Sequence, residues 1–285
     1  MDSGELRKIG KAATSSARSL ASLSGDVRNK AISNIADGLS SSRPEITLEN
    51  SRDIEKGREK GLSEAVLDRL LLNYERIDAI ARDVLSVVGL PDPVGETIEM
   101  NTMPNGLEIS RRRVPLGVIG VIYESRPNVT VDISALCLKS GNAVILRGGS
   151  EAFHSNTVLA DVIRAAILDA GISKDAVQIV GSTDRKFVSE MLKMDEFIDL
   201  MIPRGGADLV ARVAKEASMP SITGGVGVCH TYVDESASLD MAVDIVFNAK
   251  VQRPSVCNAL DTMLVHVSAA PEYLPKIANA FAEAG

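Results

Sequence analysis

A cysteine in a polar segment is the residue of this sequence best suited to act as a nucleophile. Residues 252–259 read QRPSVCNA and contain Cys257, one of three cysteines in the 285-residue chain. The segment follows an amphipathic stretch at 238–250 and precedes a strand-like run at 259–266, so we expect it to form a loop. A loop cysteine near a positive charge such as Arg253 can have a pKa below its usual value of about 8.5. Cys257 is therefore either a reactive thiolate or an inert packing residue.

The other cysteines favour structural roles. Cys137 lies between Leu136 and Leu138 in the apolar stripe of an expected helix, which indicates core packing. Cys229 and His230 are neighbours in a strand-like run, where consecutive side chains point to opposite faces. Because they could not readily bind one ion and the sequence has no C-x-x-C, we expect no metal site.

Four segments rich in glycine, serine and arginine follow apolar, strand-like runs. They are residues 123–127, 147–150, 181–183 and 203–206. Expected helices separate the runs, an order typical of a mainly parallel sheet covered on both faces, in which ligands bind beyond the carboxyl ends of the strands. Glycines allow close approach to the backbone, and helix N-termini favour anions. Together the four segments predict a site for a phosphate-bearing ligand.

The remaining elements predict how this sheet is framed. Residues 1–90 have the spacing of amphipathic helices, and Asn105-Gly106 lies between two alternating runs, which indicates a hairpin. A fifth strand is possible at 220–223. We expect an α/β fold with two domains: N-terminal helices and a dinucleotide-binding domain at 1–226, and a partial catalytic domain at 227–285.

Composition and missing motifs exclude several classes of function. The net charge is −7, aromatic residues make up 3% and tryptophan is absent, which argues against a nucleic-acid partner. The apolar runs are far shorter than the about 20 residues of a membrane span, and the N-terminus lacks a signal core. We therefore expect a cytoplasmic protein. The fingerprints G-x-G-x-x-G between strand and helix, the P-loop and G-x-S-x-G are missing.

Long stretches of the chain resemble the γ-glutamyl phosphate reductase family of the aldehyde dehydrogenase superfamily. The strongest is RRRVPLGVIGVIYESRPNVTVDISALCLKSGNAVILRGGSEAFHSN at 111–156, followed by MIPRGGADLV, ITGGVGVCHTYVDES and NAKVQRPSVCNALDTMLVH. The resemblance covers essentially the whole chain. It implies an aldehyde-dehydrogenase-like fold with a helical N-terminal region, an open, mostly parallel cofactor sheet and the start of a second α/β catalytic domain. It also implies NADPH-dependent reduction of L-glutamyl 5-phosphate to L-glutamate 5-semialdehyde and phosphate, a step of proline biosynthesis.

The resemblance also implies roles for individual residues. Cys257 falls on the family's nucleophile, and Ser125 lies where the wider superfamily has an oxyanion-binding Asn, a role that Asn258 or Asn128 could take instead. Arg126, Asn128 and Arg253 are the implied substrate-binding residues. The implied cofactor-binding residues are Arg147, Gly148, Gly149, Ser150, Ser182, Thr183, Arg204, Gly205 and Gly206. Ser150 stands where NAD-preferring relatives carry a Glu, so the site should accept a 2′-phosphate, which Arg147 could pair with.

Two departures from the family qualify this interpretation. Val226 stands where some members have an acidic residue, so we assign no general base there. The chain ends at Gly285 whereas family members continue, so we expect a truncated form whose full-length counterpart is a homo-oligomer, with glutamate 5-kinase as a possible working partner. The alternatives are a non-catalytic NADP-binding fragment and a reductase of a related acyl phosphate.

Overall fold

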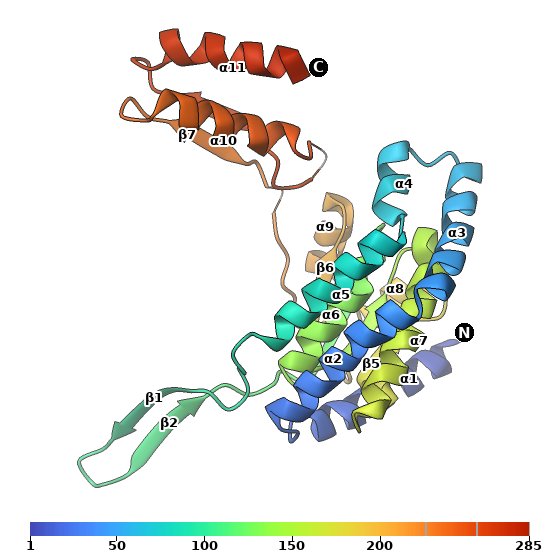
Figure 1. The fold of residues 1–285 in the computed structure, drawn as a ribbon. Helices are drawn as coiled ribbons and strands as arrows, with labels where there is room; N and C mark the ends of the chain where they lie inside the picture. The colour runs from blue at the N-terminus through green and yellow to red at the C-terminus, as the bar shows by residue number, and fades with distance from the viewer. Residues whose placement is uncertain (226, 255, 285) are drawn as a thin grey trace. The chain divides into compact units, whose positions relative to one another are not determined.

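The fold is described from a computed structural model that covers residues 1–225, 227–254 and 256–284 (Figure 1). The chain divides into two compact units, Met1–Gly224 and Gly225–Gly285. Val226, at which we placed the domain boundary and assigned no base, lies outside the described residues. That boundary therefore stays a prediction.

The first unit begins with the expected helices. An Asp2–Glu5 capping box starts the first of them, with Glu5 N–H donating to Asp2 Oδ1 at 2.8 Å, and Asn73 caps the last by accepting from Arg76 N–H at 2.8 Å. The helices are α1 (Ser3–Leu20), α2 (Gly25–Ser41), α3 (Arg43–Glu59), α4 (Glu64–Leu70) and α5 (Tyr74–Val88).

The hairpin follows as predicted. Strand β1 (Thr97–Thr102) pairs antiparallel with β2 (Glu108–Arg112), and both strands are exposed along their whole length. Gly106 has a φ of +85° in the connecting turn, a conformation that a glycine adopts without strain.

The central sheet is parallel, as expected. Its strands are β3 (Val118–Tyr123), β4 (Ala143–Arg147), β5 (Val177–Ile179) and β6 (Leu200–Arg204), in the order β5-β4-β3-β6. The chain thus moves outward from β3 to β5 and then returns to the other side of β3, which makes the β3–β6 boundary a topological switch point. The possible fifth strand is reduced to one parallel bridge between Ser221 and Met201.

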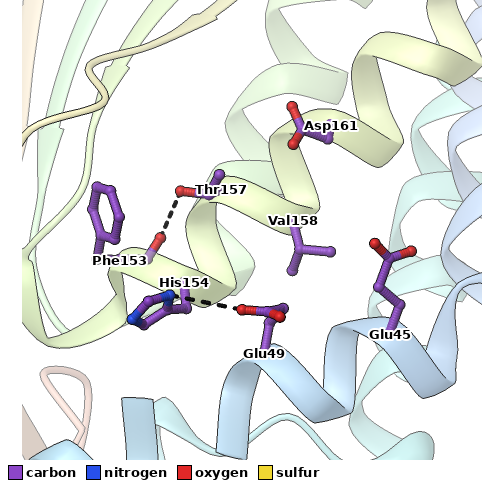
Figure 2. A pocket seen from close by; sticks show the side chains of 7 residues that line it. All are labelled: Glu45, Glu49, Phe153, His154, Thr157, Val158 and Asp161. Atoms are coloured by element: carbon purple, nitrogen blue, oxygen red, sulfur yellow. Dashed lines mark hydrogen bonds and ion pairs between the residues drawn. The ribbon is translucent and has the colours of Figure 1, made fainter. Parts of the chain in front are cut away.

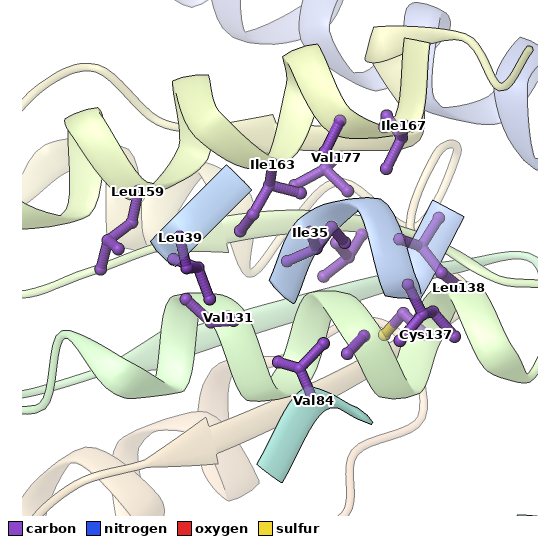
Figure 3. Close-up of a cluster of buried hydrophobic side chains, with 14 of the residues drawn as sticks. Ile35, Leu39, Val84, Val131, Cys137, Leu138, Leu159, Ile163, Ile167 and Val177 are labelled. Atoms are coloured by element: carbon purple, nitrogen blue, oxygen red, sulfur yellow. The ribbon is translucent and has the colours of Figure 1, made fainter. Parts of the chain in front are cut away.

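Helices cover both faces of this sheet. They include α6 (Asn128–Lys139), α7 (Phe153–Asp169), α8 (Lys186–Met191) and α9 (Ala207–Glu216), with short 3-10 turns η1 (Ser150–Ala152) and η2 (Lys174–Ala176). Alternate strand residues face opposite cores: Val121 packs with α2, α5, α6 and α7, and Ile122 packs with α1 and α8. Cys137 lies in the first of these cores, 7% exposed, which confirms its packing role (Figure 3).

The second unit is a β-α-β arrangement followed by a helix. Strands β7 (His230–Val233) and β8 (Thr262–Val265) are parallel and are joined through α10 (Leu239–Val251). Helix α11 (Ala270–Ala284) packs its buried Tyr273 into the hydrophobic core of the second unit. This helix was not predicted from the sequence. Among the described residues, no helix has the length and apolar character that crossing a membrane requires.

Candidate active site

Hydrogen bonds between loops bring several predicted site residues to the carboxyl edge of the parallel sheet. Glu124 N–H at the end of β3 donates to Arg204 O at the end of β6 over 3.1 Å. The Nη2 of Arg147, the last residue of β4, donates to Thr183 O after β5 over 3.1 Å. Because each bond crosses from one strand end to another, the four glycine- and serine-rich segments form one surface, as the sequence predicts.

Ser125 is held at this edge by Glu151. It is the non-glycine residue with a positive φ, +47°, in the described chain. Its backbone N–H and its hydroxyl both donate to Glu151 Oε1, at 2.5 Å and 2.9 Å. A hydroxyl has one proton to donate, so in this arrangement Ser125 has none left for an oxyanion. The predicted oxyanion role of Ser125 would require its release from Glu151.

Arg147 lies beneath the edge and is only 7% exposed. Its Nη1 donates to Gly148 O at 2.9 Å and its Nη2 to Thr183 O, while its buried Nε–H has no hydrogen-bond partner among the residues that the structure describes. Burial lowers the pKa of the Arg147 guanidinium, and the nearby charge of Glu151 opposes that effect. A buried cation with an unsatisfied donor fits a site for an anionic ligand.

Two of the predicted phosphate-loop glycines make room for the protein's own side chains. A Cβ on Gly149 would lie 2.1 Å from Glu151 Oε1, and one on Gly148 would lie 2.1 Å from Asn156 Nδ2. The close approach that glycine permits is thus made here by a carboxylate and an amide. Ser150 follows at the start of η1 and is exposed.

A second carboxylate occupies the N-terminus of α9. Gly206, the residue that precedes α9, donates its N–H to Glu124 Oε2 at 3.1 Å. A Cβ on Gly205 would lie 2.5 Å from the same oxygen, so the carboxylate rests against the glycine backbone. The sequence suggested no role for Glu124, which lies within the segment 123–127, or for Glu151, which directly follows the segment 147–150.

Two further predicted residues follow β3: Asn128 is the first residue of α6, and Arg126 precedes that helix. Asn128 donates through Nδ2 to Asp132 Oδ2 at 2.9 Å, one turn further along the helix. Burial raises the pKa of Asp132 to about 6, against the effect of the Asn128 hydrogen bond, and the charge of Asp83 raises it further. Arg126 is half-buried. Ser182, in the loop after β5, accepts from Asp184 N–H through Oγ at 3.3 Å.

The predicted nucleophile lies in the second unit, in the loop between α10 and β8. Cys257 is exposed, as are Asn258 and Arg253. Successive turns shape the loop: Val256 N–H donates to Arg253 O at 3.3 Å, and Ala259 N–H to Val256 O at 3.1 Å. The structure therefore gathers these three predicted residues on one exposed loop, as the sequence indicates.

Cys229 approaches the same loop. Its Sγ lies 3.5 Å from the carbonyl oxygen of Cys257, within reach of an S–H···O hydrogen bond. Within the described part of the chain, no group of three His, Cys, Asp or Glu side chains is arranged to hold a metal ion.

A surface pocket of about 180 Å³ lies between α3 and α7, apart from the predicted residues (Figure 2). Its Glu49 carboxylate already has partners: His154 Nδ1 is 3.7 Å from Glu49, which also pairs with Arg52 at 2.9 Å. The pocket is lined by Glu45, Glu49, Phe153, His154, Thr157, Val158 and Asp161.

Comparison with known proteins places this fold and these loops in a family. A sequence model described as the aldehyde dehydrogenase family matches residues 1–284. The γ-glutamyl phosphate reductase of Halothermothrix orenii is 54% identical over 271 residues, which is 95% of this chain and 65% of that protein. That of Vibrio vulnificus is 52% identical over 273 residues, 96% of this chain and 66% of that protein.

Solved structures of proteins with the same name are also similar to this chain. The crystal structure of the γ-glutamyl phosphate reductase from Thermotoga maritima superposes with a TM-score of 0.92 at 45% identity, covering 99% of this chain and 68% of that one. The enzyme of the same name from Saccharomyces cerevisiae gives a TM-score of 0.72 at 30% identity, covering 99% and 70%. This chain spans just under two thirds of the length of the curated relatives, 65% and 66% for the two named above.

Proposed function

The chain belongs to the aldehyde dehydrogenase family, and we propose that it is part of an enzyme that reduces L-glutamyl 5-phosphate to L-glutamate 5-semialdehyde and phosphate with NADPH. The observation that carries the proposal is an exposed cysteine, Cys257, on a loop of a chain 54% identical to a γ-glutamyl phosphate reductase. On this proposal the chain acts in proline biosynthesis.

Cys257 is the proposed nucleophile. Its thiolate attacks the acyl carbon of the substrate, the carbon–oxygen bond to phosphate breaks, and a thioester to Cys257 remains. After reduction, the resulting thiohemiacetal collapses to the aldehyde and returns the thiolate. Asn258 and Ser125 are the proposed oxyanion donors, and Arg253, Arg126 and Asn128 the proposed partners of the anionic substrate.

A nicotinamide dinucleotide would be held at the carboxyl edge of the parallel sheet. When bound, it supplies the hydride that reduces the thioester. The unsatisfied Nε–H of buried Arg147 and the N-terminus of α9 fit an anionic ligand of this kind. The proposed contacts are Arg147, Gly148, Gly149, Ser150, Ser182, Thr183, Arg204, Gly205 and Gly206. Ser150 adds no negative charge, which supports a preference for the 2′-phosphate of NADPH.

A second candidate function is dinucleotide binding without catalysis. It is favoured by the span of the chain, which matches 65% of the length of the H. orenii protein. Reduction of a related acyl phosphate is the third candidate. A homo-oligomer is proposed for the full-length form, supported by the exposed apolar side chains of Ile98, Met100 and Ile109 on the hairpin. Glutamate 5-kinase as a partner and a cytoplasmic location stay predictions.

The test is the reverse reaction: NADP-dependent oxidation of glutamate semialdehyde in the presence of phosphate, followed by NADPH absorbance. We would compare this chain with one extended to the length of its relatives, each with and without Cys257→Ser. Loss of nearly all turnover in Cys257→Ser, with Cys137→Ala as a control that retains it, is expected. Turnover by the Cys257→Ser variant at the wild-type rate would refute the mechanism. Turnover only by the longer chain favours the dinucleotide-binding candidate for this one.

A further inference from the structure

The carboxylate of Glu124 lies where a phosphate-binding helix would receive its ligand. We propose that Glu124 closes the anion position at the N-terminus of α9 in the cofactor-free protein, and that a dinucleotide phosphate must displace it. Glu124 would then set the affinity for the cofactor. This inference rests on the proposed function, because that proposal brings the dinucleotide to this edge of the sheet.

The start of α9 is already occupied by a carboxylate. The first N–H groups of a helix have no partner within the helix and attract negative charge. Gly206, the residue before α9, has no side chain to cap the helix, and its N–H donates to Glu124 Oε2 at 3.1 Å. The carboxylate lies so close to Gly205 that a Cβ there would be 2.5 Å away. The carboxylate of Glu124, the residue that follows β3, thus serves as the anion at the start of this helix.

The same edge of the sheet carries a buried positive charge. Arg147 is 7% exposed and, within the described chain, its buried Nε–H has no partner, so the edge holds an incompletely satisfied cation. Burial lowers the pKa of the Arg147 guanidinium, and the charges of Glu151 and, less strongly, Glu124 raise it. Glu124 therefore supplies negative charge to both groups that would otherwise attract a phosphate.

The Glu124 carboxylate can leave this position without a movement of the main chain. Glu124 N–H is fixed to Arg204 O at 3.1 Å, and the next residue, Ser125, is fixed to Glu151 through two hydrogen bonds. The backbone is thus anchored at both residues, whereas Glu124 itself is exposed to solvent. Rotation of its side chain into water would free the Gly206 N–H.

Competition between two anions for one set of donors has a measurable consequence. A phosphate must displace Glu124 and also approach its negative charge, so removing the charge should strengthen binding. A single exposed charge at a helix N-terminus changes affinity by about two- to fivefold. We expect Glu124→Gln and Glu124→Ala each to bind NADPH about fivefold more tightly than the wild-type chain.

The experiment measures dissociation constants, not turnover. NADPH is titrated by its nicotinamide fluorescence, and inorganic pyrophosphate by calorimetry, against the wild-type chain and the two Glu124 variants. Glu283→Gln, an exposed position on α11, makes the same change in net charge and serves as the control. Tighter binding of both ligands by the Glu124 variants, with Glu283→Gln unchanged, is the expected result.

The two ligands separate this inference from the proposed function. If the wild-type chain binds NADPH and the Glu124 variants bind both ligands no better, the closure by Glu124 is wrong and the cofactor assignment stands. If no variant binds NADPH but the Glu124 variants bind pyrophosphate more tightly, the closure is supported and the cofactor assignment fails. Weaker binding of both ligands by the variants would overturn the inference, because Glu124 would then assist the ligand.

Discussion

Glu151 and Ser125 are joined by two hydrogen bonds to one carboxylate oxygen, at 2.5 Å from the backbone N–H and 2.9 Å from the hydroxyl. Ser125 has a φ of +47°, which for a residue with a Cβ costs about 1 kcal/mol. The carboxylate offsets this cost, since hydrogen bonds to a charged group are stronger than neutral ones. Glu151 therefore stabilises the left-handed backbone conformation of Ser125, in the loop that follows β3.

Removing the Glu151 carboxylate should destabilise the first unit. Because Glu151→Ala leaves both donors of Ser125 without their partner, we expect the free energy of unfolding to fall by about 2 kcal/mol. Glu151→Gln keeps one acceptor oxygen and should cost less. Urea denaturation followed by circular dichroism measures both variants.

A second variant tests the same contact from the opposite side. Gly149→Ala would place a Cβ 2.1 Å from Glu151 Oε1 and so expel the carboxylate from Ser125. It should lose stability much as Glu151→Ala does, and the double variant should lose little more. Additive losses in the double variant would show that the two residues do not act through one contact.

Much of the sheet domain follows from local sequence pattern. Apolar, β-branched runs such as 118–123 form buried strands, and the amphipathic stretches between them form helices. Helix α11 was not predicted because Pro275 lies inside it, where proline usually argues against a helix, whereas Pro271 lies in the first turn, where proline is tolerated. The possible fifth strand at 220–223 forms one isolated bridge in the described chain, between Ser221 and Met201 of β6, and this is too short a pairing to count as a strand.

The site was harder to foresee because its contacts join segments distant in sequence. Glu124 reaches α9 only because β6 returns beside β3, and strand order is not encoded in any local run. The glycines at 149 and 205 were expected to let a ligand approach the backbone, and in the structure the protein's own carboxylates lie against them. Periodicity identifies elements, whereas these contacts depend on topology and on side-chain rotamers.

A buried aspartate on α3 should be important for stability. Asp53 is 3% exposed and accepts from Ser155 N–H at 2.8 Å, Ser155 Oγ at 2.7 Å and His154 N–H at 3.2 Å, so it caps the start of α7 from another helix. Asp53→Ala leaves the two buried donors of Ser155 and the half-buried N–H of His154 without this partner, and it should reduce the free energy of unfolding by about 3 kcal/mol.

Thermal and urea unfolding of Asp53→Ala provide the measurement, with Asp26→Ala on α2 as a control for the loss of an acidic side chain. Asp53→Asn keeps one acceptor and should fall between the wild type and Asp53→Ala. Equal stability of Asp53→Ala and the wild type would show that α7 does not need this cap.

The three cysteines should react with iodoacetamide at different rates. Burial raises the pKa of the Cys137 thiol to about 12, so it should resist alkylation near neutral pH until the protein unfolds. Cys257 is exposed and Cys229 is partly exposed, so Cys257 should react first. Peptide mapping by mass spectrometry after timed labelling gives the three rates, and labelling in urea controls for intrinsic reactivity. Alkylation of Cys137 before Cys257 would contradict this order.

Asp132 should make the first unit less stable as the pH rises from about 4 to about 6. Burial raises its pKa from 3.8 to about 6 in the folded protein, so the folded state holds a proton that the unfolded state releases. The contribution of Asp132 to stability is therefore highest below about pH 4, falls through this window and is constant above it. The pKa difference corresponds to roughly 3 kcal/mol at most, and solvent at this half-buried position reduces that to roughly 2 kcal/mol.

Asp132→Asn isolates this effect, because its amide oxygen still accepts from Asn128 but cannot ionise. The variant should match the wild type near pH 4 and exceed its free energy of unfolding by about 2 kcal/mol at pH 7. Urea denaturation of both proteins across this range gives the difference curve, and Asp37→Asn on the exposed surface of α2 corrects for net charge. A difference that does not change with pH would show that Asp132 has the same pKa in the folded and unfolded states and that its burial does not raise that pKa.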